Sequence, residues 1–215
     1  MLNAIALLLT ILLMILNGCG SDKTVLRVVS ADPIQLPPEA ADEVAQVIEQ
    51  ENEYRMAAGQ APLVPGLVCT LHSVQSTTPA SIPASPPAAV ATFVYEGAFN
   101  QAETPASEGL NVLPEALRSI YTQWYVVKCQ GQIVITNSDY HLFNLTSDDG
   151  SNLYLGGALL VNNDGNHSMQ LRSGTKLLKR GVHAFRLDYM QGPAGSQGLI
   201  LGDSEGVIPG ALFYR

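Results

Sequence analysis

Two adjacent aspartates, Asp148 and Asp149, offer the clearest chemistry in this sequence. They lie within Ser147–Gly157, between two strand-like runs at 140–146 and 153–161. Asp-Asp-Gly is typical of a tight turn, because aspartate caps its own backbone and glycine adopts positive φ. Neighbouring carboxylates also repel each other. The pair therefore indicates either a well-solvated turn or a bound positive charge such as a divalent cation, which prefers oxygen ligands.

Two further segments carry oxygen-bearing side chains. Asn163 and Asp164 belong to the run 162–167, which is typical of a hairpin turn and could alternatively complete a cation site. The loop from Gln191 to Gln197 combines amide side chains with glycine, proline and serine. It predicts either the rim of a shallow sugar site or a plain connection between strands.

Catalytic motifs are missing from the sequence. It contains no nucleophile elbow, no phosphate-binding loop and no paired acids in a motif context. The four histidines are dispersed, without the spacing of a zinc site. His183 shares a strand face with Phe185 and Leu187 and is expected to be a satisfied core residue. We therefore expect a protein that is not an enzyme.

The N-terminus predicts export. Residues 2–16 are almost continuously apolar, and the run is too short for a comfortable membrane span. It ends in Leu16-Asn17-Gly18-Cys19, which resembles the cleavage signal of bacterial lipoproteins. That resemblance implies removal of residues 1–18, a lipid on Cys19 and anchorage to a bilayer in the bacterial cell envelope. Gly20 follows the cysteine, which in that family favours the outer membrane. An ordinary signal peptide or an uncleaved anchor is the alternative.

Cys69 and Cys129 are the remaining cysteines. In an oxidising envelope they are expected to form a disulfide, and two buried free thiols are the alternative. On the chain-entropy model, closing a loop of this length stabilises a fold by about 4 kcal/mol.

The distribution of charged residues and of proline and glycine divides the chain into segments. A formal net charge of −8 without basic clusters argues against nucleic-acid binding. Residues 19–37 are polar and predict an extended tether. The arm 38–65 predicts a helix over 38–58, with Pro38 in its first turn and Gly59 after its end. This helix is expected to dock on the following domain, and binding to a partner is the alternative. Its expected apolar face comprises Ala40, Val44, Val47, Ile48 and Tyr54.

The sequence pattern of residues 66–215 predicts a mainly β domain, either a sandwich or a barrel. Short runs rich in Val, Ile, Leu, Phe and Tyr alternate with turn residues. The expected strands are 67–74, 90–96, 124–128, 131–136, 140–146, 153–161, 168–172, 176–179, 182–190, 197–201 and 211–214. Prolines make 75–89 a loop, and 97–119 is expected to be an insertion with a helical turn after Pro114.

The order of motifs resembles the protective-antigen fourteen-kilodalton (PA-fourteen) domain family. The matching segments are Gly66-Leu67, Tyr140 to Leu145, Ser147 to Ser151, Leu153 to Gly157, Leu159 to Gly165, Gly181 to Tyr189, Gln191-Gly192-Pro193 and Leu199 to Leu201. The Ser-Asp-Asp-Gly segment followed by the Gly-x-His strand is the specific combination. The resemblance implies an antiparallel β-barrel or sandwich of the PA-fourteen type, preceded by the short helix and the tether.

The family also implies a function. In its carbohydrate-binding members, adjacent aspartates joined by a cis peptide bind Ca²⁺, and the ion holds sugar hydroxyls. By that resemblance Asp148 and Asp149 are expected Ca²⁺ ligands, and the alternative is a structural turn. We thus expect a lipid-anchored envelope protein that recognises glycans. The rivals are a structural or protein-binding module, and an accessory domain of a glycan-degrading system.

Overall fold

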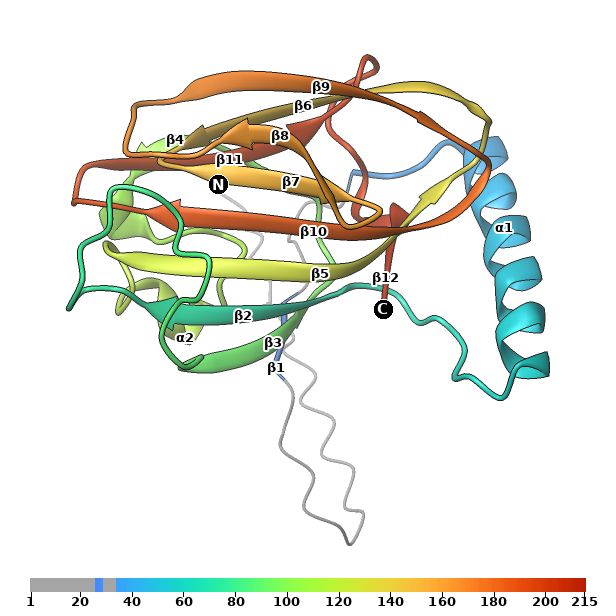
Figure 1. Cartoon of the computed structure of the whole chain (residues 1–215), viewed down its shortest axis with the longest axis horizontal. Coiled ribbons are helices and arrows are strands. Elements are labelled where there is room, and N and C mark those ends of the chain that lie inside the picture. Colours follow the sequence, from blue (N-terminus) through green and yellow to red (C-terminus); the bar gives the residue numbers. More distant parts are fainter. Residues whose placement is uncertain (1–25, 29–33) are drawn as a thin grey trace, which may run out of the picture.

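The described part of the chain folds as two β-sheets packed face to face, with a long helix at one end (Figure 1). The structure is a computed structural model and describes residues 26–28 and 34–215. The expected signal segment 1–18, the lipidation site Cys19 and most of the tether 19–37 lie outside the described residues. The mainly β fold expected from the sequence is confirmed.

The larger sheet has eight strands, in the order β1-β3-β2-β5-β10-β7-β8 with β12 paired to β5, and the smaller sheet has four, in the order β4-β11-β6-β9. Their bounds are β1 (Leu26–Val28), β2 (Leu67–Ser73), β3 (Ala91–Tyr95), β4 (Asn100–Pro105), β5 (Tyr125–Ile135), β6 (Asp139–Asp148), β7 (Ser151–Leu155), β8 (Ala158–Asn163), β9 (Gln170–Leu178), β10 (Gly181–Gln191), β11 (Ser196–Gly202) and β12 (Phe213–Tyr214). Among the described residues neither sheet closes on itself. The fold is therefore a sandwich, and the barrel alternative is wrong.

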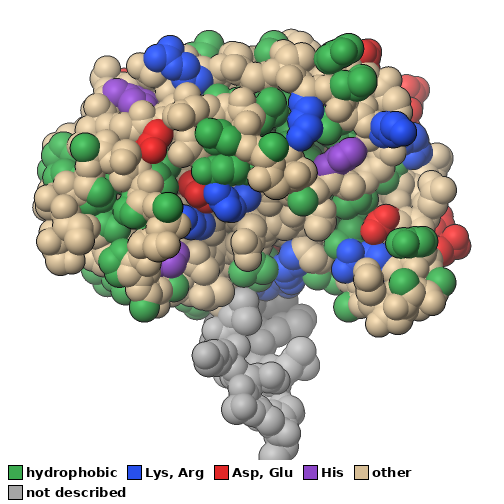
Figure 2. Space-filling model, in the orientation of Figure 1, with side chains coloured by type: hydrophobic (Ala, Val, Ile, Leu, Met, Phe, Trp, Pro, Cys, Tyr) green, Lys and Arg blue, Asp and Glu red, His purple; other side chains and the backbone are tan. Residues whose placement is uncertain are grey.

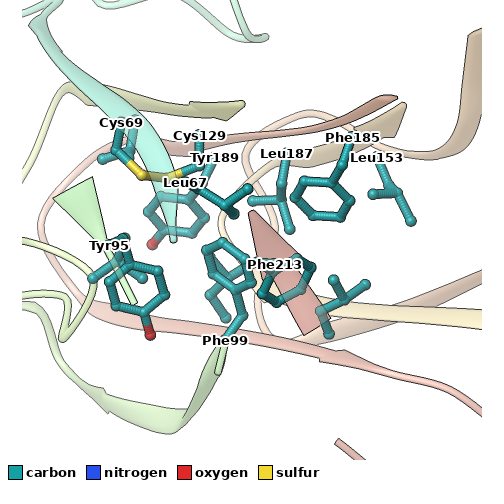
Figure 3. Close-up of a cluster of buried hydrophobic side chains, with 14 of the residues drawn as sticks. Leu67, Cys69, Tyr95, Phe99, Cys129, Leu153, Phe185, Leu187, Tyr189 and Phe213 are labelled. Atoms are coloured by element: carbon teal, nitrogen blue, oxygen red, sulfur yellow. A yellow bond between two sulfur atoms is a disulfide. The ribbon is translucent and has the colours of Figure 1, made fainter. Parts of the chain in front are cut away.

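The hydrophobic core fills the space between the two sheets. On β10, Phe185, Leu187 and Tyr189 are buried, as the alternation along this strand predicts. Figure 3 shows Phe185 packed beside the rings of Phe99 and Phe213, whose centroids lie 6.4 and 4.8 Å from that of Phe185. The opposite face of β10 therefore points out of the sandwich.

One expected strand is in fact two. The run 153–161 is divided into β7 and β8 by a turn at Gly156 and Gly157, whose φ values are 61° and 79°. Positive φ at both central residues is the geometry of the tightest hairpins, and glycine adopts it without strain. Continuous apolar residues on both sides hid this turn. Conversely, the runs 124–128 and 131–136 belong to the single strand β5. The runs 168–172 and 176–179 likewise merge in β9.

Two strands occupy regions where none was expected. β1 lies in the expected tether and pairs in parallel with β3, at the edge of the eight-stranded sheet. β4 lies in the expected insertion 97–119 and pairs with β11. Both are short or polar, so periodicity gave no signal. The rest of that insertion holds η1 (Ala106–Glu108) and α2 (Glu115–Arg118), which confirms the helical turn after Pro114, and η2 (Gly210–Leu212) precedes β12.

The expected helix is present as α1 (Pro38–Ala57) and ends before Gly59, whose φ is 72°. Val44 and Val47 are buried and pack against Val134 of β5, so the helix docks on the sandwich. Tyr54 is 70% exposed, which contradicts its assignment to the buried face. A search of the described residues for a helix long and apolar enough to cross a membrane found none.

Cys69 and Cys129 face each other on the neighbouring strands β2 and β5 and are joined by a disulfide in the structure. Both side chains are fully buried in the core. The bond links two positions separated by 60 residues. It therefore connects the first strand of the domain to the central strand on which β10 and β12 pair.

The double variant Cys69→Ala/Cys129→Ala is expected to lower the free energy of unfolding by about 4 kcal/mol, the loop-closure contribution for this separation. Urea unfolding under non-reducing conditions measures this difference. Wild-type protein unfolded with a reductant should approach the stability of the variant. Equal stability of oxidised wild type and variant would show that the two thiols are not joined in solution.

Candidate functional site

The adjacent aspartates lie where the chain crosses from one sheet to the other. Asp148 ends β6 in the four-stranded sheet, and Ser151 begins β7 in the eight-stranded sheet. The peptide bond between Asp148 and Asp149 is cis. The segment is therefore an inter-sheet corner, and the expectation of a tight turn with positive φ at the glycine is wrong. We name residues 148–151 the aspartate corner.

Gly150 serves this corner through close packing. It does not have the positive φ that a hairpin turn would need. A Cβ at this position would lie 2.8 Å from the backbone nitrogen and oxygen of Gly165. The loop from β8 to β9 thus packs directly on the corner, and a larger residue would push the two segments apart.

The Asp149 carboxylate joins three loops. Its Oδ1 accepts a hydrogen bond from the His167 backbone N–H at 3.0 Å, and its Oδ2 accepts one from the Gly192 backbone N–H at 2.8 Å. Burial raises the pKa of the Asp149 carboxyl, and these two donors work in the opposite direction because they favour its charged form. Asp149 therefore acts as the acceptor that fixes the loops around the corner.

The Asp148 carboxylate is the open one of the pair. The residue is only 6% exposed, yet no described residue donates a hydrogen bond to its side-chain oxygens. Burial and the neighbouring Asp149 and Glu103 charges raise its pKa from 3.8 to about 6, and His167 lowers it. A carboxylate that receives no donor from the protein depends on solvent or a cation to compensate its charge. It is suited to receive a cation or the donors of a ligand.

A third oxygen lies beside the corner. A Cβ built on Gly192 would lie 2.5 Å from Asn166 Oδ1 and 3.2 Å from Asp149 Oδ2, so both oxygens border the same point of the Gly192 backbone. Asn166 is exposed. Carboxylate and amide oxygens together are the hard ligands that Ca²⁺ prefers. The described residues contain no group of three His, Cys, Asp or Glu side chains suited to a metal.

Buried polar side chains form hydrogen bonds on the core side of the aspartate corner. The Tyr189 hydroxyl lies 2.6 Å from the Asp148 carbonyl oxygen and 2.5 Å from Gln191 Oε1. The Tyr125 hydroxyl donates to Gln197 Oε1 at 3.1 Å. Burial raises the pKa of both tyrosines, so both hydroxyls keep their protons. The expectation that Gln191 and Gln197 form the rim of a sugar site is therefore corrected, because both are fully buried. Gln191 Nε2 donates to the Pro193 and Ser196 carbonyl oxygens, whereas Gln197 accepts from the Tyr125 hydroxyl.

Asn163 and Asp164 also have structural partners. Asn163 is 2% exposed and its Nδ2 donates to Ser147 Oγ at 2.9 Å, across the gap between the sheets. Asp164 Oδ1 accepts from the backbone N–H groups of Gly165 and Ile82, both at 2.8 Å. The expected hairpin at 162–167 is instead an inter-sheet loop, which ties the loop 75–89 to the corner.

The histidines are not arranged as metal ligands. The two ring nitrogens of His167 lie 2.9 Å from the carbonyl oxygens of Asn163 and Ser168, so they face the backbone. His183 is half-buried, and its Nε2 lies 2.7 Å from the Lys179 carbonyl oxygen. Its expected place in the core is wrong, because its ring faces the Lys179 backbone at the turn before β10 and is not part of the core cluster.

Sequence reasoning included Asn166 only as part of the run 162–167, and it missed the backbone N–H groups of His167 and Gly192 and the charge of Glu103. The backbone donors carry no residue signature. Asn166 lies beside the predicted pair Asn163 and Asp164, in the same oxygen-rich run, and this run was the available signal.

The sandwich with an aspartate corner defines the class of the domain, and comparisons identify it. Residues 118–206 match the model of the PA14 domain family. The PA14 domain of the MpAFP antifreeze protein aligns with 16% identity and a TM-score of 0.53, over 71% of this chain and 92% of that chain. The chain therefore carries a PA14-type domain, as the sequence motifs predicted. A search of the curated proteins found no match.

Two adhesin domains share the fold. The PA14 sugar-binding domain of an RTX adhesin has 17% identity and a TM-score of 0.51, over 71% of this chain and 99% of that chain. The A domain of epithelial adhesin 6 from Candida glabrata, solved with Galβ1-3GlcNAc, has 14% identity and a TM-score of 0.50, over 70% and 87%. At these identities the similarity shows the fold alone.

Asp148→Asn is expected to make the protein more stable at neutral pH without divalent cations. Because the Asp148 pKa is raised to about 6, the folded chain holds this proton more tightly than the unfolded chain. Its stabilising contribution is complete below about pH 4 and lost as the pH rises past about 6. We expect a gain of about 1 kcal/mol at pH 7, since solvent at the open side screens part of the effect. Thermal unfolding in chelator across this range measures it, with exposed Asp42→Asn as the matched control. A loss of stability in Asp148→Asn would contradict this electrostatic picture.

Asp149→Asn is expected to have the opposite effect. An amide has one accepting oxygen, so either the His167 or the Gly192 N–H would lose its partner. A buried donor without a partner costs about 1–3 kcal/mol. Chemical unfolding at neutral pH should show this loss, and slower-than-bulk hydrogen exchange at Gly192 should disappear. Unchanged exchange at Gly192 would rule out the assigned role of the carboxylate.

Proposed function

We propose that this PA14-type domain binds carbohydrate at the aspartate corner, with Ca²⁺ between the protein and the sugar hydroxyls. The observation that carries the proposal is the Asp148 carboxylate, which receives no hydrogen bond from the described residues and is next in the chain to Asp149. Asp149 Oδ2 and Asn166 Oδ1 both lie beside Gly192 and offer further oxygens. An ion held by so few protein oxygens leaves coordination positions for hydroxyl groups of a ligand. The sugar-binding RTX adhesin domain and the adhesin domain solved with Galβ1-3GlcNAc share the fold and support this reading.

The two aspartates have different roles in this proposal. Asp149 already accepts hydrogen bonds from the backbone N–H groups of His167 and Gly192, so its carboxylate oxygens are held in position before an ion binds. Asp148 is uncommitted and gains its compensating charge from the ion. Pre-organisation of this kind lowers the cost of binding, because no loop has to be ordered. The role is binding, without catalysis by the domain itself.

The expected context of this binding is the bacterial cell envelope. We propose that Cys19 carries lipid and anchors the exported chain to a bilayer, with the outer membrane favoured. The support is the Leu16-Asn17-Gly18-Cys19 motif in the sequence. Anchored in this way, the domain would display its corner to glycans as an adhesin-type module.

A protein-binding role is the second candidate, and a patch on the four-stranded sheet favours it. Tyr140 and Leu177 form a cross-strand pair on β6 and β9 and are 70% and 58% exposed. Leu142 and Leu171 on the same strands are 36% and 54% exposed. Neighbouring exposed apolar side chains are typical of interaction surfaces.

Calorimetric titration of Ca²⁺ into chelator-stripped protein tests the proposal. Wild type should bind one ion with saturation, and the variant Asp148→Asn should bind it at least 10-fold more weakly, because a charged ligand is lost. Asp42→Asn, with the same charge change on the exposed helix, should match wild type. Glycan screening in Ca²⁺, beginning with Galβ1-3GlcNAc, should give binding that the chelator and Asp148→Asn both abolish.

Ca²⁺ binding that survives in Asp148→Asn would place the ion elsewhere. Absence of both Ca²⁺ heat and glycan binding would remove the lectin proposal. The exposed patch on the four-stranded sheet would then define the stronger candidate function, recognition of a protein partner.

A further inference from the structure

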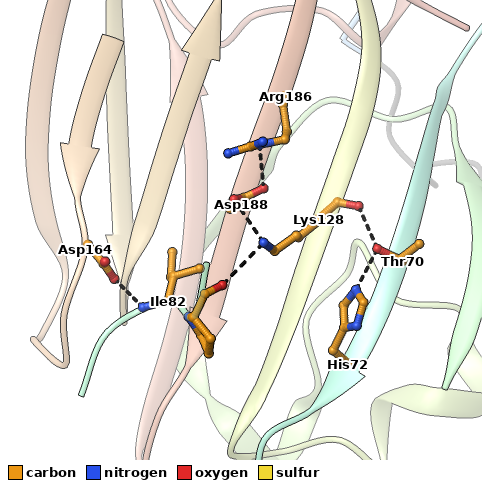
Figure 4. Close-up of polar contacts among 8 residues, drawn as sticks. Thr70, His72, Ile82, Lys128, Asp164, Arg186 and Asp188 are labelled. Atoms are coloured by element: carbon orange, nitrogen blue, oxygen red, sulfur yellow. Dashed lines mark hydrogen bonds and ion pairs between the residues drawn. The ribbon is translucent and has the colours of Figure 1, made fainter. Parts of the chain in front are cut away.

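The outer face of the eight-stranded sheet holds a second polar cluster, separate from the aspartate corner. Asp188 is 1% exposed although it lies on the outward side of β10. Lys128 Nζ on β5 lies 3.7 Å from Asp188 Oδ2, and Arg186 Nε lies 3.2 Å from Asp188 Oδ1 (Figure 4). Lys128 also donates to the Pro83 carbonyl oxygen of the loop 75–89, at 3.4 Å, so this loop covers one side of the cluster.

Arg186 has no well-aligned acceptor in this cluster. Its Nε is buried, and the contact with Asp188 Oδ1 lacks hydrogen-bond geometry, so both atoms remain without a hydrogen bond among the described residues. No described residue accepts a hydrogen bond from the two terminal nitrogens of Arg186 either. The guanidinium lies instead over the ring of Tyr154, 3.7 Å from its centroid, which fixes its plane. A guanidinium held flat with its fork unpaired is suited to a bidentate acceptor.

An open groove of about 440 Å³ lies directly beside this guanidinium. Its walls include the Arg186 and Arg215 side chains, and its lining adds Gln130, Tyr154 and Ala184. Neither the Gln130 amide nor the Tyr154 hydroxyl has a hydrogen-bond partner among the described residues. The groove therefore offers two cationic groups, an amide and a phenol, with a small residue between them.

The local charge is positive although the chain carries a net charge of −8. Lys128 and Arg186 face the single carboxylate of Asp188. Arg27 and Arg215 face the single carboxylate of Glu96. The Arg27, Arg215 and Glu96 group keeps one uncompensated positive charge. In the other group the Asp164 carboxylate also acts on Asp188. In Figure 2, some blue side chains lie near the middle of the face on which β5 and β10 run, beside a red one, and others are spread over the rest of this face.

We propose that this groove binds an acidic carbohydrate, a sugar that carries a carboxylate, with the carboxylate on the Arg186 fork. Arg215 provides the second positive charge, and Gln130 and Tyr154 provide hydrogen-bonding groups for ring hydroxyls. A carbohydrate is favoured over an acidic peptide because Gln130, Tyr154, Arg186 and Arg215 line the groove with polar groups. The larger aliphatic and aromatic residues of the lining are Val68, the buried Phe185 and Tyr154, and a flat ring suits a sugar face. The groove and the aspartate corner are separate, since Arg186 and Gly192 are about 20 Å apart along the strand direction.

The test uses an oligogalacturonate as the probe, in chelator so that the aspartate corner makes no Ca²⁺-dependent contribution. Calorimetry should show saturable binding that weakens as ionic strength rises. Arg186→Gln should weaken it about 10- to 100-fold, the range for a lost charged hydrogen-bond pair. Arg180→Gln is the matched control, because Arg180 is exposed at the turn before β10 and the charge change is the same. Thermal unfolding of both variants establishes that they are folded.

Titrations with other probes determine which chemical class of ligand the groove binds. The methyl ester of the oligogalacturonate has no charge and should not bind. Absence of saturable binding, or equal weakening in Arg180→Gln, would overturn the site. A polyglutamate peptide or inorganic phosphate that binds as tightly as the oligosaccharide would overturn the assignment to a carbohydrate. Asp148→Asn should leave this binding unchanged, so the acidic-sugar groove and the Ca²⁺-dependent corner can fail independently.

Discussion

The arrangement of the functional end depends on one buried acceptor, the Asp149 carboxylate. Its two oxygens take the backbone N–H groups of His167 and Gly192, which belong to loops far apart in the sequence. Both loops carry the chain from one sheet to the other, as the aspartate corner itself does. A charged acceptor makes stronger hydrogen bonds than a neutral one, and its burial makes an unpaired state expensive. The loops are therefore held in position by a side chain that also forms the site.

The central strand β10 connects this constraint to the rest of the fold. Its inward side chain Tyr189 reaches the Asp148 carbonyl oxygen, and Gln191 at its end supports the loop that carries Gly192. Its outward side chain Arg186 lines the groove on the opposite face, and Asp188, two residues along the strand, contacts Arg186 from below the surface. Because side chains alternate along a strand, one rigid element positions two chemically different surfaces. A distortion of β10 would be felt by both surfaces.

Sequence analysis predicted the elements that show a regular periodicity or a characteristic residue at a fixed position. Alternation predicted β10, the helix signals predicted α1, and the motif order predicted a PA14-type domain. β4 escaped prediction because its sequence Asn-Gln-Ala-Glu-Thr-Pro has no apolar alternation, and its pairing with β11 compensates. The Gly156-Gly157 turn escaped because its neighbours are apolar on both sides.

The candidate site was predictable only in part, for a physical reason. Asp148 and Asp149 stand out because adjacent carboxylates are unfavourable in an ordinary turn. Gln191 and Gln197 carry the same amide chemistry whether they face solvent or a buried tyrosine, and sequence does not distinguish the two cases. The donors that hold Asp149 are backbone N–H groups, which every residue except proline possesses. Their position follows from three inter-sheet loops meeting at one place, which is a property of the whole fold.

The different roles of the two aspartates follow from which of them receives backbone hydrogen bonds. If both carboxylates were satisfied by backbone donors, the corner would be a structural element and would need no ion. If neither were satisfied, the loops would lack a fixed reference and the site would have to form on binding, at an entropic cost. Here one carboxylate is satisfied and one is not. A rigid frame therefore presents a single uncompensated charge, and this is the arrangement in which a cation or ligand gains most from being added.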